Sequence, residues 1–301
     1  MDRAQQEALA RLRAPRPDRW LAGVGLDWAL ILLAVGAAAR WARPEGYLLA
    51  MLVVGNRQHA LAIIGHDGAH RSISRCRWLN DALTCLLCFW PLGLGLDGYR
   101  KHHYLHHRHT GTAQDPELTY KGWNAPQWDL PLSGRRLGRL LCRDLLALSP
   151  RALLNLRRTI PPVSLRDVAG PLLWWAVALA VMLHYGCAWI ALLWAGSLAT
   201  TYWATFRLRV WTEHMGTRGT HRISVTWWQR LFAPHNTWCH WEHHRWPSLP
   251  SAQLPATRAL KAAPECQPLT RLFRSYRQTP RVPSGYATTP GPGAEAAGGG
   301  E

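Results

Sequence analysis

Three short histidine clusters, HDGAH, HYLHH and HWEHH, carry the residues whose types and spacing suit metal chemistry. Their histidines are His66, His70, His103, His106, His107, His240, His243 and His244. Side chains three or four positions apart share one face of a helix, so each cluster can direct its imidazoles toward one point. A zinc ion takes three or four protein ligands, so eight imidazoles predict two metal ions rather than one. Neutral imidazole binds iron, zinc, copper and nickel, and the ligand type therefore does not select the metal.

Four apolar stretches surround these clusters, each near the roughly 20 residues that cross a bilayer. They cover residues 21–39, 47–65, 167–185 and 187–206. Asp27 is the charged exception in the first stretch. Asn56, Arg57, Gln58 and His59 lie in the middle of the second, and because polar groups are costly in lipid, we expect these four to face the protein interior. We predict an all-α integral membrane protein with four transmembrane helices and a cytosolic helical cap that holds the dinuclear site. A soluble helical protein with very apolar core helices is the alternative.

The charge distribution predicts the orientation. Lysine and arginine number 35 against 18 acidic residues, which gives a formal net charge of +17. Five arginines precede the first stretch, two lie between the first and second, and none lies between the third and fourth. By the positive-inside rule, we expect both termini and the histidine clusters to lie on the cytoplasmic side. Nucleic-acid recognition motifs are absent from the sequence, and anionic lipid headgroups are the expected partners of the arginines.

Ligands of one site must lie on one side of the membrane, so the apolar run 79–98 between the first two clusters should not cross it. Pro91, Gly93 and Gly95 interrupt this run, which favours an interfacial or re-entrant helix. Residues 133–158 alternate leucines with arginines at helical spacing, which is typical of helices that lie on a membrane surface.

The chain then divides into four parts. We predict a cytosolic amphipathic lead-in over residues 1–20 without a cleavable signal peptide, and a membrane domain over 21–260. A cytosolic C-terminal segment over 261–277 and a disordered Pro/Gly-rich tail over 278–301 complete the chain.

Four segments resemble the membrane fatty acid desaturase and hydroxylase superfamily, most of all its bacterial acyl-lipid desaturase branch. They are HDGAHRSISRCRWLNDAL, GYRKHHYLHHRHTGTAQDPEL, RVWTEHMG and RLFAPHNTWCHWEHHRWPSLP, in the family's order and at similar separations. The resemblance covers about residues 20–255. It implies a non-haem centre of two iron ions that uses O₂ as co-substrate and removes hydrogen from an acyl chain.

The resemblance also assigns ligands. The eight cluster histidines match, and relatives place a further ligand histidine soon after the last membrane span, where this chain has His214. In some relatives an asparagine four residues earlier helps to hold a metal-bound water, but here that position is Val210. His102 lies one turn before His106 and is an alternative to His103, although His103 alone completes the HxxHH pattern.

Carboxylates beside the clusters are candidates for a second layer around the metals, because ligand histidines donate their other ring nitrogen to such groups. The candidates are Asp67, Asp115, Glu213 and Glu242. An ordinary exposed carboxylate or helix cap is the alternative for each.

We therefore expect a desaturase that acts on an acyl chain held as lipid, CoA or carrier-protein thioester. A hydroxylase or ketolase of a smaller or isoprenoid substrate is the first alternative, and a histidine-rich metal-binding protein without redox chemistry is the second. HWEHH lacks the HExxH spacing of zinc proteases. No reductase module is encoded, so electrons must come from an external donor, a ferredoxin or similar carrier with its reductase. An acidic carrier would complement the arginine-rich face.

Overall fold

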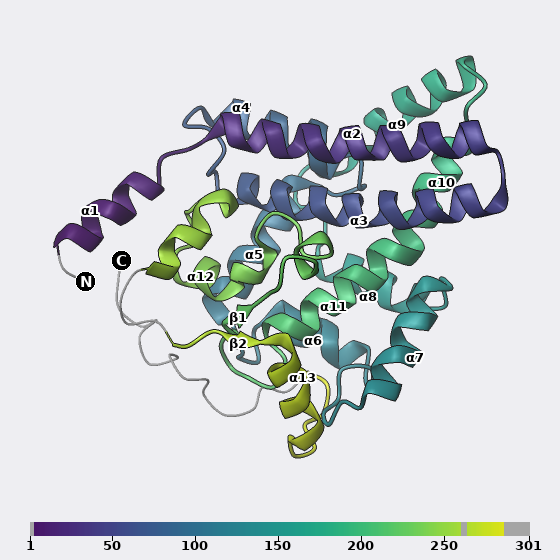
Figure 1. The fold of residues 1–301 in the computed structure, drawn as a ribbon. Coiled ribbons are helices and arrows are strands. Elements are labelled where there is room, and N and C mark those ends of the chain that lie inside the picture. The colour runs from purple at the N-terminus through teal and green to yellow at the C-terminus, as the bar shows by residue number, and fades with distance from the viewer. Residues whose placement is uncertain (1–2, 260–263, 286–301) are drawn as a thin grey trace.

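The structure, a computed structural model, describes residues 3–259 and 264–285 (Figure 1). Helices dominate this part of the chain, and two short parallel strands, β1 (Ile223–Ser224) and β2 (Gln267–Pro268), make the one small sheet within it. The predicted all-α class is confirmed in its main feature, because the strands only join two loops.

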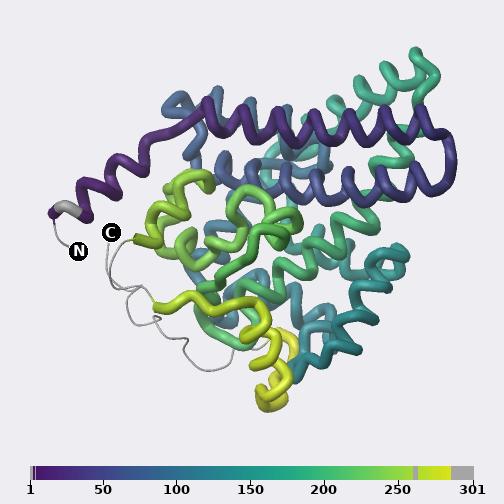
Figure 2. Tube along the Cα trace, viewed as in Figure 1, coloured from purple at the N-terminus to yellow at the C-terminus, as the bar shows by residue number. Residues whose placement is uncertain are grey.

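A helical hairpin forms one side of the molecule. After α1 (Arg3–Leu12), α2 (Pro17–Trp41) and α3 (Pro44–Ala69) lie side by side along their whole length (Figure 2). Each of these two long helices has proline in its first turn, where the missing N–H carries no penalty. The hairpin contains both of the first two apolar stretches.

Three helices of the described chain are long and apolar enough to cross a membrane: α2, α3 and α9 (Arg166–His184). The fourth expected span, 187–206, lies in a helical run made of α10 (Trp189–Ser197), the π-turn η2 (Leu198–Tyr202) and α11 (Trp203–Glu213). The π-turn divides this run into pieces that are each too short to count as a span. A crossing by the whole run therefore stays a prediction.

The interrupted run packs closely on α3 at Gly55. A Cβ atom at Gly55 would lie 2.6 Å from the Thr201 Cβ and 2.8 Å from the Ser197 carbonyl oxygen, so only glycine permits this approach. Nearby, the buried Gln58 amide donates to the Trp194 carbonyl at 2.9 Å. Asp27 of α2 is fully buried as well. Of the four polar residues predicted to face the interior, Gln58 and His59 are buried, whereas Asn56 and Arg57 are partly exposed.

The segment between the first two clusters contains no helix that is long and apolar enough to span a membrane. It forms the 8-residue α4 (Arg77–Thr84) and the 5-residue π-turn η1 (Cys85–Phe89), and then turns at Gly93 with a φ of +69°. At about 1.5 Å per residue these two elements are too short for a hydrocarbon core of about 30 Å. They leave the first two clusters on the same side, as expected.

Four helices form the predicted helical cap. They are α5 (Leu96–His109), α6 (Pro116–Trp123), α7 (Gly134–Leu145) and α8 (Pro150–Thr159). The last two are the helices predicted within residues 133–158. A buried ion pair between Arg207 of α11 and Asp144 of α7 fastens them to the rest, and the Arg207 guanidinium also lies 5.0 Å from the centre of the Trp128 ring.

The C-terminal part closes the molecule through the 3₁₀ turns η3 (Gln229–Leu231) and η4 (Thr237–Cys239), α12 (His240–Arg245), the 3₁₀ helix η5 (Ser251–Ala259) and α13 (Leu269–Gln278). The prediction of a disordered tail from residue 278 onward is wrong for residues 278–285. Val282 pairs with Leu130, and the Ser284 backbone N–H donates to Asp129 at 2.7 Å. These partners are some 150 residues away in sequence, so composition alone could not reveal them. The predicted tail from 286 lies outside the described residues, as do 1–2 of the lead-in.

Candidate metal centre

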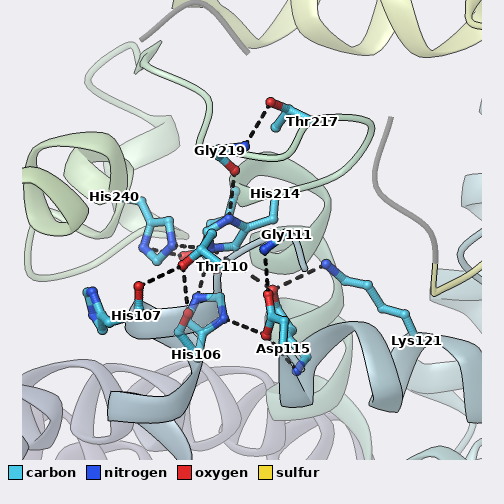
Figure 3. A network of polar contacts seen from close by, with 12 residues as sticks. His106, His107, Thr110, Gly111, Asp115, Lys121, His214, Thr217, Gly219 and His240 are labelled. Carbon is cyan, nitrogen blue, oxygen red and sulfur yellow. Dashed lines mark hydrogen bonds and ion pairs between the residues drawn. The ribbon is translucent and has the colours of Figure 1, made fainter. Parts of the chain in front are cut away.

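The structure gathers all nine predicted histidines into two neighbouring groups. The first group has five members: His66, His70, His103, His107 and His243. The second group has four: His106, His214, His240 and His244. Figure 3 shows part of the second group, with His106, His214 and His240 turned toward one another. Within each group, one possible ligand atom per residue lies within 4.8 Å of all the others.

The Nε2 atoms in the first group converge on His103. Its Nε2 lies 2.7 Å from the Nε2 of His66 and 2.9 Å from those of His70 and His107. The His107 Nε2 is in turn 2.8 Å from the Nε2 of His243. One nitrogen from each of five rings therefore meets in one place.

The second group is built in the same way around His214. Its Nε2 lies 3.1 Å from the His106 Nε2 and 2.8 Å from the His240 Nε2. The His244 Nε2 is buried and has no hydrogen-bond partner. Leaving a buried polar atom unpaired costs about 1–3 kcal/mol, so a ligand that binds this nitrogen is expected.

These separations fit metal ligation. With metal–nitrogen bonds of about 2.1 Å, neighbouring ligands are roughly 3.0 Å apart around an octahedral ion and roughly 3.4 Å apart around a tetrahedral one. The contacts of 2.7–3.1 Å are closer to the octahedral spacing. The spacing thus fits two metal ions, one at each group.

Burial keeps these imidazoles in the form that binds metals. It lowers the pKa of His107 to about 2 and that of His214 to about 3. Burial, with the neighbouring imidazoles, also holds the pKa values of His240, His243 and His244 well below their usual range. All five are neutral at pH 7, and neutral imidazole is the metal ligand.

Helix ends bring the histidines together. The C-terminal end of α3 supplies the first cluster, α5 the second, and α12 the third, while His214 directly follows α11. Asp167 of α9 caps the start of α5, although it lies some 70 residues further along the chain. Its carboxylate accepts the backbone N–H groups of Asp97 and Gly98, both at 2.9 Å. A carboxylate at a helix N-terminus satisfies free N–H groups and opposes the helix dipole.

Replacing this cap tests its role. Asp167→Ala should lower the free energy of unfolding by about 1–2 kcal/mol, because two N–H groups at the start of α5 and the Val163 N–H lose their acceptor. Asp167→Asn retains one acceptor oxygen, so its free energy of unfolding should lie between those of the wild type and Asp167→Ala. The midpoint of thermal unfolding in detergent measures both variants, and an unchanged midpoint for the alanine variant would remove Asp167 from this account.

Two of the four predicted carboxylates hold a histidine. Asp115 Oδ1 lies 2.9 Å from the His106 Nδ1, and Glu213 Oε1 lies 3.3 Å from the His240 Nδ1. The His214 Nδ1 instead donates to the Gly219 carbonyl at 2.9 Å. These partners fix the rings so that each Nε2 faces the site.

The other two carboxylates, those of Asp67 and Glu242, hold no ligand histidine. The prediction that they orient a metal-binding ring is therefore wrong for these two residues. Asp67 accepts the Ser251 backbone N–H at 3.0 Å and its hydroxyl at 2.8 Å, and Glu242 pairs with the guanidinium of Arg222 at 2.8 Å. The reason is rotation along the helix: one or two positions after a ligand, a side chain points 100° or more away from it. Both residues position the segment around α12 rather than a ring.

His103, not His102, belongs to the first group. The His102 Nδ1 lies 2.7 Å from the Thr159 carbonyl oxygen, which joins α5 to α8. Val210, at the position of the asparagine in some relatives, is buried in the apolar core and offers no ligand atom.

Sequence reasoning missed one pair beside the second group. Glu117 Oε2 lies 4.0 Å from the His214 Nε2, and the Lys121 ammonium donates to the same oxygen at 3.2 Å. Burial raises the pKa of Glu117, but Lys121, His214 and His106 outweigh it and hold that pKa well below its usual range. Lys121 is only 2% exposed, which is rare for lysine. This burial distinguishes the pair from an ordinary surface ion pair, and it is a feature of the fold rather than of the sequence.

A cavity of about 110 Å³ opens onto both groups. Its histidine wall includes His103 and His214. The remaining walls come mainly from apolar or aromatic side chains of α3, α5, α8 and the π-turn run: Ala62, Tyr99, Leu156, Ile160, Tyr202 and Phe206. A hydrocarbon chain suits such walls.

The chain belongs to the fatty acid desaturase family, a family of oxidoreductases. The family model, described as fatty acid desaturase, matches residues 42–277, which include every histidine of both groups.

Individual relatives are similar over shorter segments. A sn-1 acyl-lipid omega-3 desaturase (ferredoxin) of Nostoc sp. (strain 36) is 35% identical over 88 residues, which is 29% of this chain and 24% of that protein. A dihydrorhizobitoxine desaturase of Bradyrhizobium elkanii is 33% identical over 122 residues, or 38% of this chain and 34% of that protein. A sn-1 oleoyl-lipid 12-desaturase of Picosynechococcus sp. (strain ATCC 27264 / PCC 7002 / PR-6) is 35% identical over 94 residues, or 29% and 27%.

The matched segments thus span about a quarter to a third of these relatives' own length. The relatives are named for lipid substrates in two cases and for dihydrorhizobitoxine in the third. Similarity alone therefore does not select the substrate class.

Proposed function

We propose that this protein is an O₂-dependent membrane desaturase that introduces a carbon–carbon double bond into an acyl chain. The observation that carries the proposal is the pair of histidine groups, five and four rings, on the wall of a mainly apolar cavity. Two iron ions held by these nine histidines would supply O₂ activation. The overall change converts –CH₂–CH₂– to –CH=CH–, while two further electrons and two protons complete the reduction of O₂ to two waters.

The chain's own residues bind and orient. His66, His70, His103, His107 and His243 would hold one ion, and His106, His214, His240 and His244 the other. Tyr99, Ile160 and Phe206 would place methylene groups of the substrate against them and exclude water. The chemistry needs this placement because an unactivated C–H bond offers no polar group to recognise.

In the proposed topology the chain crosses a bacterial inner membrane four times, with α2, α3, α9 and the run from α10 to α11, and keeps the site and both termini in the cytoplasm. The positive-inside pattern and the three long apolar helices support it. Exposed leucines on the α7–α8 cap support contact with the membrane surface: Leu145, Leu146, Leu148 and Leu154.

The mass of the product tests the reaction. Purified protein, reconstituted with ferrous iron and supplied with O₂, a ferredoxin and its reductase, should convert a saturated or monounsaturated acyl lipid to a product that lacks two hydrogens. A product that has gained one oxygen atom would overturn desaturation in favour of hydroxylation.

We also propose that the electrons enter where the three clusters end. Each cluster is followed directly by an arginine, and Arg71, Arg108 and Arg245 are all exposed. The His107 and His244 rings, one from each metal group, stack 4.3 Å apart, and both residues are partly exposed. Three exposed cations, each directly after a ligand cluster, suit an acidic electron carrier such as a ferredoxin.

Removing these charges should weaken carrier-driven turnover. The triple variant Arg71→Gln, Arg108→Gln, Arg245→Gln is expected to lose about tenfold in carrier-dependent rate at low salt, with the difference shrinking as salt rises, because screened charges no longer steer the encounter. Turnover driven by a small uncharged reductant should be unchanged. Equal losses with both reductants would contradict docking at this face.

A further inference from the structure

A second cavity, of about 210 Å³, lies beside α11, next to the cavity at the metal groups. None of the nine histidines of the metal groups is among its lining residues, and Arg209 is the wall that the two cavities share. The other walls are mainly apolar and come from α11, α13 and the loop around η3: Leu208, Ile223, Val225, Trp228, Phe232 and Phe273. This cavity is therefore a site apart from the metal groups.

His59 of α3 is the unusual side chain in these apolar walls. It is only 1% exposed, and neither of its ring nitrogens has a hydrogen-bond partner among the described residues. Leaving buried polar atoms unpaired is costly. A ligand in the cavity that pairs with the His59 ring would remove this cost.

One wall of the cavity is a loop with exposed aromatic side chains. Trp228 and Phe232 line the cavity and are 49% and 59% exposed, and Trp227 and Leu231 are more exposed still. The loop is tied to a candidate membrane span, because the Arg57 guanidinium of α3 donates to the Leu231 carbonyl at 3.3 Å. Tryptophans beside a span are typical of the membrane–water interface, the level at which the ester groups of lipids lie. In the proposed topology this wall faces lipid.

The chemistry of the cavity suits an acyl chain that carries an ester carbonyl. Apolar walls bind hydrocarbon, and a neutral imidazole carries one N–H donor for an oxygen. An ester is uncharged, so it enters an apolar cavity at a lower desolvation cost than a carboxylate does. The one cation in the wall, Arg209, is already paired with Glu213 at 2.6 Å, so it offers little charge to balance a carboxylate.

We propose that this cavity binds one acyl chain of an ester-linked membrane lipid, and that the His59 ring donates a hydrogen bond to the ester carbonyl. The inference rests on the membrane topology of the proposed function, but not on its iron chemistry. It places a bound lipid beside the metal groups, with Arg209 between the two sites.

Two lipids that differ only in the carbonyl group test the contact. Full-length protein, as purified in detergent and without reductant, is equilibrated with radiolabelled dioleoyl phosphatidylcholine or with its diether analogue, and bound lipid per chain is measured. Wild type should bind the diester about tenfold more tightly, because the diether lacks the carbonyl acceptor. His59→Phe should bind both lipids equally, at about the affinity of wild type for the diether, and this retained binding shows that the variant is folded.

A second variant tests the position of the chain. Ala233→Phe adds a ring to the wall of the cavity and should weaken the binding of both lipids at least about tenfold. Ala180→Phe adds the same ring on the exposed surface of α9 and should bind both lipids as wild type does. Unchanged binding in Ala233→Phe would overturn the assignment of the lipid to this cavity.

The contact with His59 has its own contrary results. Equal affinity of wild type for the two lipids, or a preference for the diester that persists in His59→Phe, would overturn the hydrogen bond and leave water as the partner of the ring. Tighter binding of oleic acid than of the diester would overturn the ester in favour of a free acid. Because binding is read without turnover, these results do not depend on whether the protein proves to be a desaturase.

Discussion

His103→Ala should lower bound iron from about two per chain to about one and reduce turnover by more than about a hundredfold. Its Nε2 lies within 2.9 Å of three other Nε2 atoms in the five-histidine group, so its loss opens the centre of that group. Loss of a residue that only orients a ligand already costs about 10- to 100-fold, and loss of the ligand itself should cost more. Iron analysis and oxygen-dependent product formation measure the two effects.

His102→Ala is the matched control. It removes the neighbouring histidine of the same helix, whose ring contacts the Thr159 carbonyl rather than either group. We expect two irons in this variant and at most a small loss of stability, about 1 kcal/mol for one hydrogen bond. If His102→Ala lost an iron and His103→Ala kept two, the assignment of the first group would be wrong.

Filling the cavity should stop the reaction without removing the metals. Ala62 of α3 lines the same cavity as the histidines, and Ala62→Phe adds a ring to a space of about 110 Å³. We expect at least a tenfold loss of turnover on long acyl chains, because the methylene groups can no longer reach the site. Bound iron should stay at two per chain, and gas-chromatographic analysis of the acyl products measures the loss.

Ala180→Phe provides the comparison for this variant. Ala180 lies on the exposed surface of α9, and the same added ring should leave turnover unchanged there. Full activity of Ala62→Phe on long chains would show that the substrate does not occupy this cavity. A loss of iron in Ala62→Phe would instead show that the cavity wall supports the metal groups.

The ligand histidines were predictable because helical periodicity decides which side chains share a face. His103 and His106 lie on one helix yet belong to different groups, a division that depends on which rings α3, α11 and α12 bring to each side. Local spacing therefore indicates that a dinuclear site exists, whereas tertiary packing decides which histidine serves which ion.

Other features depend on contacts that local sequence does not encode. The partner of Asp67 is Ser251, 184 residues away, and the partner of Ser284 is Asp129, 155 residues away. Asp115-Pro116-Glu117 reads as an ordinary exposed helix start, and only the fold reveals that Lys121 one turn later is buried. The π-turn over Leu198–Tyr202 carries no proline or glycine that would announce it.

Metal content of the purified wild type tests the central claim most directly. The protein, reduced and reconstituted anaerobically with ferrous iron in detergent, should bind about two irons per chain, with zinc measured alongside as a minor component. A single tightly held zinc, or failure to bind two irons, would contradict the dinuclear oxidase.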